Sequence, residues 1–250
     1  MAAPERTAQQ GEAHDVRLLI SRMEDGRPEI FSSVQGEGVS AGVASTFVRL
    51  ATCNLRCSWC DTAYTWDWTR FDRAKQTMEM DVDTVANDVL ARPPRNAVIT
   101  GGEPLIQRAQ LVPLAGRLKD AGMRIEVETN GTVSPGPLTD LVDQWNVSPK
   151  LHHAGNEGVE RLPDGPLRDF AARDNAFFKF VVQRESDLNE VEELRSRYNI
   201  PAGRVVLMPE GTTAAQLNAR SPWLAEACAE HGYRFSSRLH ILIWGDKRGV

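Results

Sequence analysis

The stretch that decides the fold class runs from Ala97 to Thr129 and reads AVITGGEPLIQRAQLVPLAGRLKDAGMRIEVET. It begins with a short apolar run, Ala97–Thr100, and ends with a second strand candidate, Arg124–Thr129. Between them, apolar residues recur every three or four positions from Leu111 to Leu118, which predicts an amphipathic helix that ends at the Ala121–Gly122 turn. This order of strand, helix and strand predicts two parallel strands joined by a crossover helix.

The same alternation extends over the rest of the chain. Short apolar runs predict strands over Val16–Ile20, Thr46–Leu50, Ala97–Thr100, Arg124–Thr129, Gln144–Ser148, Ala176–Val182, Arg204–Met208 and Tyr233–Ile241. Helical periodicity lies between them, over residues 82–90, 111–118, 188–194 and 213–230, with Asp81 placed to cap the first helix. We therefore expect an α/β fold on a parallel sheet, either open or closed into a barrel. Ligands of such sheets bind at the carboxyl ends of the strands, so motifs that follow strands are the candidate functional residues.

Length and composition exclude several classes of protein. The 250 residues suffice for one hydrophobic core, and the net charge of −5 provides no basic surface for duplex nucleic acid. No apolar run reaches the length of a membrane span, and the polar N-terminus lacks the apolar centre of a signal peptide. We predict a mobile tail over residues 1–15, one core domain over residues 16–250, and a cytoplasmic protein with no membrane partner and no direct nucleic-acid partner.

Three of the four cysteines lie in the sequence Cys53-Asn-Leu-Arg-Cys57-Ser-Trp-Cys60, which follows the predicted strand Thr46–Leu50. Clustered cysteines in an intracellular protein indicate a metal site or catalysis rather than disulfides. Iron–sulfur clusters take thiolate ligands, and a four-iron cluster held by three cysteines keeps one iron open, as reactive metal centres do. A structural zinc site is the alternative, but it needs a second ligand pair with matching spacing. Cys228 lies in a helical pattern and is predicted to be a buried apolar residue.

The spacing Cys-x3-Cys-x2-Cys, with an aromatic residue before the last cysteine, resembles the motif of the radical S-adenosylmethionine superfamily. The resemblance implies a partial (β/α)6-type barrel that holds a 4Fe–4S cluster through Cys53, Cys57 and Cys60. In that superfamily the open iron is chelated by the amino and carboxylate groups of S-adenosylmethionine. An electron from the cluster then breaks a carbon–sulfur bond and gives methionine and a 5′-deoxyadenosyl radical.

Three further motifs follow predicted strands. The glycines of Thr100-Gly-Gly-Glu-Pro104 allow a backbone to approach a ligand closely, and the carboxylate can accept hydrogen bonds from an amine. Glu128-Thr-Asn-Gly131 and Ser148-Pro-Lys150 end the next two strands, where their polar groups suit ribose and adenine. Each motif, taken alone, is also an ordinary turn. The resemblance implies that the S-adenosylmethionine contacts are Trp59, Cys60, Asp61, Gly102, Glu103, Glu128, Ser148, Pro149 and Lys150.

Motifs outside the cysteine loop narrow the resemblance to one family. Val34-Gln-Gly-Glu-Gly38 precedes the strand Thr46–Leu50, Asp61-Thr62 follows the last cysteine, and LHILIWGDKRGV occupies residues 239–250. From about Glu29 onward, this combination resembles the 7-carboxy-7-deazaguanine synthase family. It implies conversion of 6-carboxy-5,6,7,8-tetrahydropterin into 7-carboxy-7-deazaguanine with loss of ammonia, on the way to queuosine or other deazapurines. The radical takes a hydrogen from pterin C6, the ring contracts, the hydrogen is returned, and Mg²⁺ assists.

The chemistry of individual residues agrees with a pterin substrate. Gln35 can donate to and accept from the polar edge of the ring, and Arg49 can bind a carboxylate through two hydrogen bonds. The Thr62 hydroxyl beside Asp61 suits a magnesium ion that keeps water and substrate oxygens as its other ligands. Glu37 is the remaining catalytic candidate, although it alternatively orients its loop or pairs with a neighbouring base. The implied substrate contacts are Val34, Gln35, Gly36, Arg49, Thr100, His240 and the terminal carboxylate of Val250.

Several alternatives stay open. His240, on a predicted apolar strand, is alternatively a core histidine, and Arg49 is alternatively part of a surface ion pair. Trp66 and Trp68 are predicted to pack rather than to stack on a ligand. A hairpin is predicted through Asp25-Gly26, in an N-terminal region of unassigned role.

The function also has alternatives. A glycyl-radical-enzyme activase shares the cysteine spacing but is expected to lack the Gln-Gly-Glu-Gly motif. A zinc-stabilised binding module would be a non-enzyme. The resemblance further implies a homodimer and a flavodoxin or ferredoxin as the electron donor.

Overall fold

The computed structural model describes residues 16–156 and 161–250, so the tail predicted over residues 1–15 lies outside the described residues. Within them, one sheet has the strand order β10-β9-β8-β7-β6-β5-β3-β1-β4, and β2 also pairs with β3. No helix in this part of the chain combines the length and apolarity that crossing a bilayer requires.

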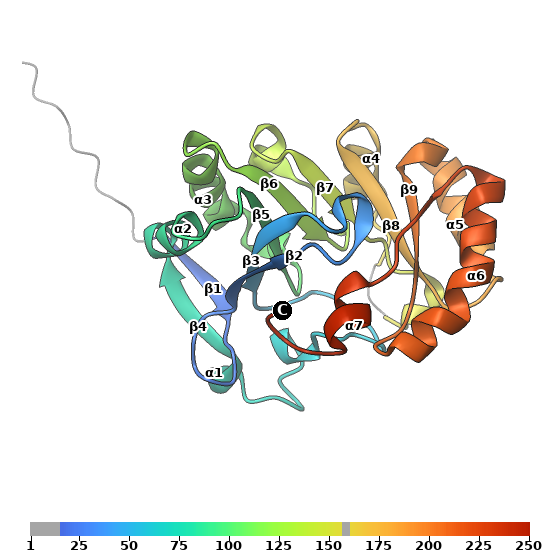
Figure 1. Cartoon of the computed structure of the whole chain (residues 1–250). Helices are drawn as coiled ribbons and strands as arrows, with labels where there is room; N and C mark the ends of the chain where they lie inside the picture. Colours follow the sequence, from blue (N-terminus) through green and yellow to red (C-terminus); the bar gives the residue numbers. More distant parts are fainter. Residues whose placement is uncertain (1–15, 157–160) are drawn as a thin grey trace, which may run out of the picture.

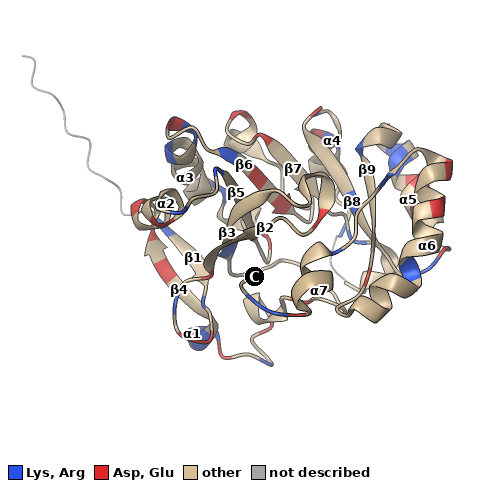
Figure 2. Cartoon of the chain, in the orientation of Figure 1, with Lys and Arg blue, Asp and Glu red and all other residues tan. Residues whose placement is uncertain are grey.

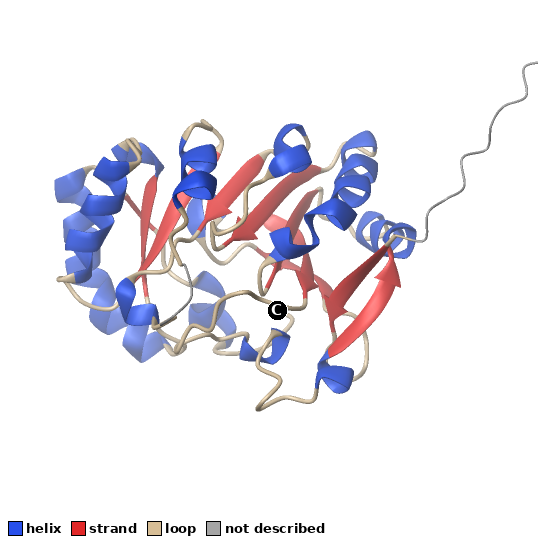
Figure 3. Cartoon of the chain, turned by 180° about the vertical axis from the view of Figure 1, so that it is seen from behind, coloured by secondary structure: helices blue, strands red, loops and turns tan. Residues whose placement is uncertain are grey.

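The centre of the sheet is parallel, as the sequence predicts. Its strands are β3 (Ala44–Leu50), β5 (Asn96–Gly101), β6 (Arg124–Thr129), β7 (Gln144–Val147), β8 (Ala176–Val182), β9 (Val205–Pro209) and the short β10 (Arg234–Phe235). The longer helices in the connections are α2 (Val82–Leu90), α3 (Arg108–Asp120), α4 (Asp164–Ala171), α5 (Asp187–Arg197) and α6 (Ala214–His231). Figures 1 and 3 show these helices along the outer side of a curved sheet, whereas the C-terminus lies on the inner side.

An antiparallel edge completes the sheet through β1 (Arg17–Ser21), β2 (Ile30–Val34) and β4 (Thr77–Asp81). The sequence analysis did not identify β2 and β4, because the serines of β2 and the acidic residues of β4 interrupt their apolar pattern. The predicted turn at Asp25-Gly26 forms and is closed by an antiparallel bridge between Arg22 and Pro28. Asp81 caps α2 by accepting from the Thr84 N–H at 2.7 Å, as predicted.

Alternation along the parallel strands separates the core from the interior of the curved sheet. Val48, Ile99 and Val127 are buried in the hydrophobic core, which the helices complete on the outer side. The next residues along the same strands, Arg49, Thr100 and Glu128, line an inner cavity, and Arg49 pairs in register with Thr100. Strand side chains alternate between the two faces of the sheet, so a shift of the strand register by one residue would place the apolar residues in the cavity and the polar ones in the core. Burial of the apolar residues in the core therefore determines that the polar residues face the cavity.

The C-terminal segment differs from the prediction. The strand predicted over Tyr233–Ile241 is wrong, because only Arg234–Phe235 pair with β9, and Leu239–Trp244 form helix α7. A short apolar run does not distinguish a strand from a helix by periodicity alone. The loop predicted over Leu151–Pro166 is also shorter than expected, because α4 begins at Asp164.

Candidate functional site

The carboxyl ends of the parallel strands surround a cavity of about 230 Å³. Six neighbouring parallel strands each contribute at least one side chain to its wall, among them Arg49, Thr100, Glu128, Asn146, Lys179 and Met208. Of the site residues predicted from the sequence, all except Glu103 and Pro149 line this cavity. The predicted residues come from segments more than 200 positions apart, and the fold brings them together at one place.

The cysteine loop leaves β3 and places the thiols of Cys53, Cys57 and Cys60 on the cavity wall. Each sulfur has a hydrogen-bond donor of its own. The Leu55 N–H lies 3.4 Å from Cys53 Sγ, and Asn156 Nδ2 lies 3.4 Å from Cys57 Sγ. The indole Nε1 of Trp66 donates to Cys60 Sγ at 3.3 Å, which gives Trp66 a contact that the sequence analysis did not predict.

These thiols fit the ligand set of an iron–sulfur cluster. No disulfide joins them, and the remaining cysteine, Cys228, is buried in α6 and does not line the cavity. Within the described residues no three acidic, histidine or cysteine side chains converge on one ion. A cluster does not need such convergence, because each thiolate binds a different iron. Burial raises the pKa of the Cys53 thiol to about 12, so the metal must displace its proton.

The two glycines after β5 allow the cysteine loop and the next loop to pack against each other. A Cβ on Gly101 would lie 2.2 Å from the Leu50 carbonyl oxygen, and one on Gly102 would lie 2.0 Å from that of Thr52. The backbone N–H of Glu103 donates to this Thr52 oxygen at 2.8 Å. Only glycine permits so close an approach.

The Glu103 side chain is turned away from the cavity. It is fully buried, and its carboxylate accepts from Leu105 N–H at 3.0 Å, Thr129 Oγ1 at 2.8 Å and Asn130 N–H at 2.6 Å. Burial raises its pKa, although these donors oppose the effect. The structure therefore gives the Glu103 side chain the role of tying the β5 loop to the end of β6, rather than a place on the cavity wall.

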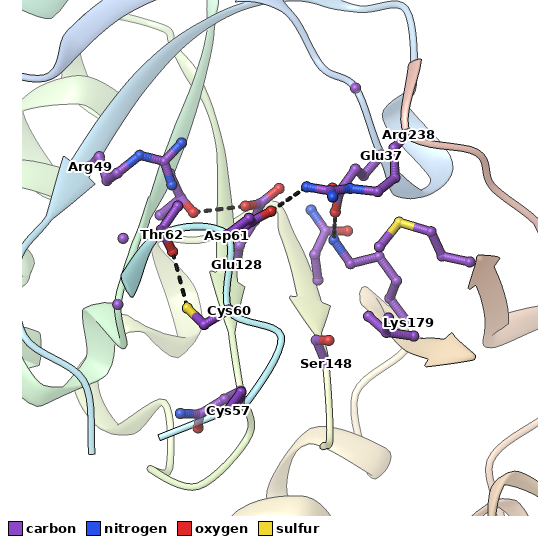
Figure 4. A pocket seen from close by; sticks show the side chains of 18 of the residues that line it. Glu37, Arg49, Cys57, Cys60, Asp61, Thr62, Glu128, Ser148, Lys179 and Arg238 are labelled. Carbon is purple, nitrogen blue, oxygen red and sulfur yellow. Dashed lines mark hydrogen bonds and ion pairs between the residues drawn. The ribbon is translucent and has the colours of Figure 1, made fainter. Parts of the chain in front are cut away.

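Charged side chains form a network around Glu37 (Figure 4). Glu37 pairs with Lys179 and accepts from Arg238 Nε at 3.0 Å, and Arg238 also pairs with Asp61. Burial alone would raise the pKa of Glu37, but the two cations outweigh it and hold that pKa well below its usual range. Glu37 is therefore a carboxylate at neutral pH, and the alternative that it pairs with a base is correct.

A second network positions Gln35. Its Nε2 donates to Glu128 Oε1 at 3.0 Å, and Thr100 Oγ1 donates to Glu128 Oε2 at 2.7 Å. Both Glu128 oxygens are thus occupied by protein donors.

On the side of the cysteine loop, Lys150 donates to Ser148 Oγ at 2.9 Å and lies 5.5 Å from the Trp59 ring centroid.

Arg49 is not part of a surface ion pair. Its Nε donates to Glu29 Oε1 at 2.8 Å, and Glu29 is fully buried. Burial alone would lower the pKa of Arg49, but Tyr64, Glu29 and Asp61 raise it above its usual value. Arg49 is therefore a fixed cation in the wall of the cavity.

His240 lies on α7 and against the glycine of the Gln-Gly-Glu-Gly motif. A Cβ on Gly36 would lie 2.0 Å from His240 Nδ1, and the Leu239 N–H donates to the Gly36 carbonyl oxygen at 2.8 Å. Burial lowers the pKa of His240, with Glu37 opposing the effect, so the ring is neutral at pH 7.

A metal ion beside Thr62 would receive a single hydroxyl from it. Thr62 lines the cavity beside Asp61, whose carboxylate is already paired with Arg238. This donor set fits an ion that keeps most of its ligands as water or substrate oxygens, as magnesium does. It does not fit a closed structural metal site.

Several residues of the wall were not predicted from the sequence, among them Asn146, Lys179 and Arg238. Lys179 carries a signal that could have identified it, because a charged residue inside the apolar run FFKFVV must face a polar interior. Arg238 carries no such signal, because it lies in a connecting segment among other polar residues.

Comparisons with known proteins agree with this geometry. The model of the radical SAM superfamily matches residues 48–168. The chain is 42% identical to the 7-carboxy-7-deazaguanine synthase of Pyrobaculum aerophilum over 88% of this chain and 95% of that protein. It is 35% identical to the synthase of Rhodopirellula baltica over 95% of this chain and 91% of that protein. A crystal structure of QueE from Escherichia coli has a TM-score of 0.68 at 24% identity, covers 90% and 95% of the two chains, and confirms the partial barrel.

Proposed function

Because this chain belongs to the 7-carboxy-7-deazaguanine synthases of the radical SAM superfamily, we propose that its cavity converts 6-carboxy-5,6,7,8-tetrahydropterin into 7-carboxy-7-deazaguanine with loss of ammonia. One observation carries the proposal. A single cavity combines three free cysteines with a fixed guanidinium and a hydrogen-bonding amide, from Arg49 and Gln35. The three cysteines suit an iron–sulfur cluster, and the guanidinium and the amide suit a flat polar ring that bears a carboxylate.

Cys53, Cys57 and Cys60 would hold the 4Fe–4S cluster, which with S-adenosylmethionine supplies the 5′-deoxyadenosyl radical when both are bound. Trp59, Gly102, Ser148 and Lys150 line the cavity and would bind S-adenosylmethionine. The close approach at Gly102 supports this assignment, because it packs the loop after β5 against the cysteine loop and so places the two segments side by side.

The substrate would be held by charge and by hydrogen bonds. Arg49 would bind the pterin carboxylate through two parallel hydrogen bonds. Gln35, oriented by Glu128, would meet the polar edge of the ring, and the anionic Glu37 would accept a hydrogen bond from a ring N–H. His240, as a neutral ring, can accept or donate without adding charge.

Thr62 would contribute one ligand to Mg²⁺, with the substrate carboxylate and water as the others. We further propose a cytoplasmic homodimer that receives its electron from a flavodoxin or ferredoxin. These assignments follow from family membership.

The test is an anaerobic assay of the reconstituted, reduced protein with S-adenosylmethionine, Mg²⁺ and the carboxylated tetrahydropterin. We expect the deazaguanine product by mass spectrometry. Cys57→Ala should abolish S-adenosylmethionine cleavage, because no nearby thiol replaces the lost ligand, whereas Cys228→Ser should retain it. Cleavage without conversion of the pterin would favour the activase, and a colourless protein with stoichiometric zinc would favour the binding module.

A further inference from the structure

Glu29, in the turn before β2, carries a charge although it is fully buried. Its Oε1 accepts hydrogen bonds from Arg49 Nε at 2.8 Å and from the Tyr64 hydroxyl at 3.0 Å. Its Oε2 accepts from Arg248 Nη2 at 2.6 Å and Nε at 3.0 Å. A buried carboxylate is tolerated only when it is paired, and here two guanidinium groups share it. Glu29 therefore joins β3 to the last residues of the sequence.

Arg248 is fastened from several sides. It also donates to the Arg22 carbonyl oxygen at 2.5 Å and to Gln76 Oε1 at 3.2 Å, and its guanidinium lies 3.6 Å from the Tyr64 ring centroid. Val250, two residues later, lines the cavity. Arg248 thus holds the segment from Gly245 to Val250 against the mouth of the barrel, at the place where Figure 1 shows the C-terminus.

The hydrogen bond to Glu29 involves only the Nε side of the Arg49 guanidinium. Within the described residues, Nε is the one guanidinium nitrogen of Arg49 that makes a hydrogen bond, so both Nη groups are free of protein partners. Arg49 lines the cavity and extends from β3 toward its centre (Figure 4). The fork formed by Nη1 and Nη2 is the part of a guanidinium that best matches a carboxylate.

We propose that Glu29 and Arg248 are positioning residues for the pterin; this proposal rests on the function proposed above. Glu29 directs the free edge of Arg49 at the substrate carboxylate. Arg248 fastens the C-terminal segment as a wall of the same pocket. Neither residue touches the reacting atoms, so both act on substrate affinity rather than on cluster chemistry.

The test of Glu29 compares two ligands of the reconstituted protein by anaerobic calorimetry with S-adenosylmethionine present. One is the carboxylated tetrahydropterin, and the other is the tetrahydropterin without its carboxyl group. In Glu29→Gln we expect the Kd of the carboxylated ligand to rise roughly 10- to 100-fold, since a charge-assisted contact is misdirected, and that of the other ligand to change little. Iron content and substrate-free cleavage of S-adenosylmethionine should stay as in the wild type.

Arg248→Met is the second variant in case Glu29→Gln does not fold, because it leaves the hydrogen bonds of Glu29 to Arg49 and Tyr64 in place. We expect roughly tenfold weaker binding of both ligands and faster hydrogen exchange over residues 245–250. Arg27→Ala is the matched control, because Arg27 lies in the same turn as Glu29 and pairs with the exposed Asp25. A folded Glu29→Gln that keeps the wild-type preference for the carboxylate, or an Arg248→Met with wild-type affinities, would overturn the proposal. Failure of the wild type to bind the carboxylated pterin would instead contradict the proposed function.

Discussion

The contact between Trp66 and Cys60 shows how one side chain can tune the site. An N–H that donates to a cluster thiolate stabilises the more negative, reduced form of the cluster, so it raises the reduction potential. Trp66→Phe keeps the ring and removes this donor. We expect the midpoint potential to fall by roughly 20–60 mV, the equivalent of one hydrogen bond for a one-electron couple. A redox titration monitored by electron paramagnetic resonance measures this midpoint potential.

Trp68→Phe is the control for this variant. Trp68 lies two residues away, contacts Arg73 and does not line the cavity. Its substitution should leave the potential unchanged. Equal potentials in Trp66→Phe and the wild type would mean that the indole N–H does not interact with the cluster.

His240 gives the protein a dependence on pH that a surface histidine would not. Because its folded pKa is lower than its unfolded value near 6.5, the unfolded chain binds more protons as the pH falls below 6.5. The stability that a neutral His240 contributes is therefore present above that pH and is lost on acidification. We expect the melting temperature to fall more in the wild type than in His240→Gln between pH 7.5 and 5.5. If the melting temperatures of the two proteins, measured by anaerobic thermal denaturation, fell equally between these pH values, the prediction would be contradicted.

At the level of secondary structure, the loop after β2 and helix α7 depend on each other. Gly38 N–H donates to Ser236 Oγ at 2.7 Å, and Gly36 lies against His240. Gly36→Ala would place a methyl group 2.0 Å from His240 Nδ1, so the His240 ring must leave its place in the cavity wall. We expect at least a tenfold rise in the KM for the pterin, measured in steady-state assays.

Gly116→Ala serves as the matched control. Gly116 lies in α3, and a Cβ there would meet nothing within 4 Å. This substitution should leave KM unchanged and should stabilise the protein by about 0.4–1 kcal/mol through the unfolded state. A KM for Gly36→Ala equal to that of Gly116→Ala would show that α7 does not shape the pocket.

The elements also show what sequence patterns can and cannot predict. Strands β6 and β8 were predicted with their observed bounds, because β8 is a nearly continuous apolar run and β6 alternates Ile125 and Val127 with polar residues. Helix α7 was predicted as a strand, because tertiary contacts determine whether such a short apolar run forms a helix or a strand. The pairing of Glu29 with Arg248 joins residues 219 positions apart, and no local pattern indicates it.

The protein as a whole is an α/β barrel with a polar interior. Below the cavity, the fully buried Glu126 accepts from Asn96 Nδ2 at 3.0 Å, Gln144 Nε2 at 3.1 Å and Asn146 Nδ2 at 3.0 Å, and it pairs with Arg124. Figure 2 shows charged residues along β6, whereas its neighbours β5 and β7 have none. The hydrophobic core thus lies outside the sheet, and the inside is left for polar ligands. The motifs after the strands could therefore be assigned to one site from the sequence, but the ion pairs between them could not.

The central claim is that three thiolates hold a four-iron cluster and leave one iron open for S-adenosylmethionine. Electron paramagnetic resonance of the reconstituted, reduced protein, recorded before and after S-adenosylmethionine is added, tests it most directly. We expect the signal of a reduced 4Fe–4S cluster whose shape changes when the cofactor binds the open iron. A cluster signal that S-adenosylmethionine leaves unchanged, or a protein that binds zinc and gives no signal, would contradict the account.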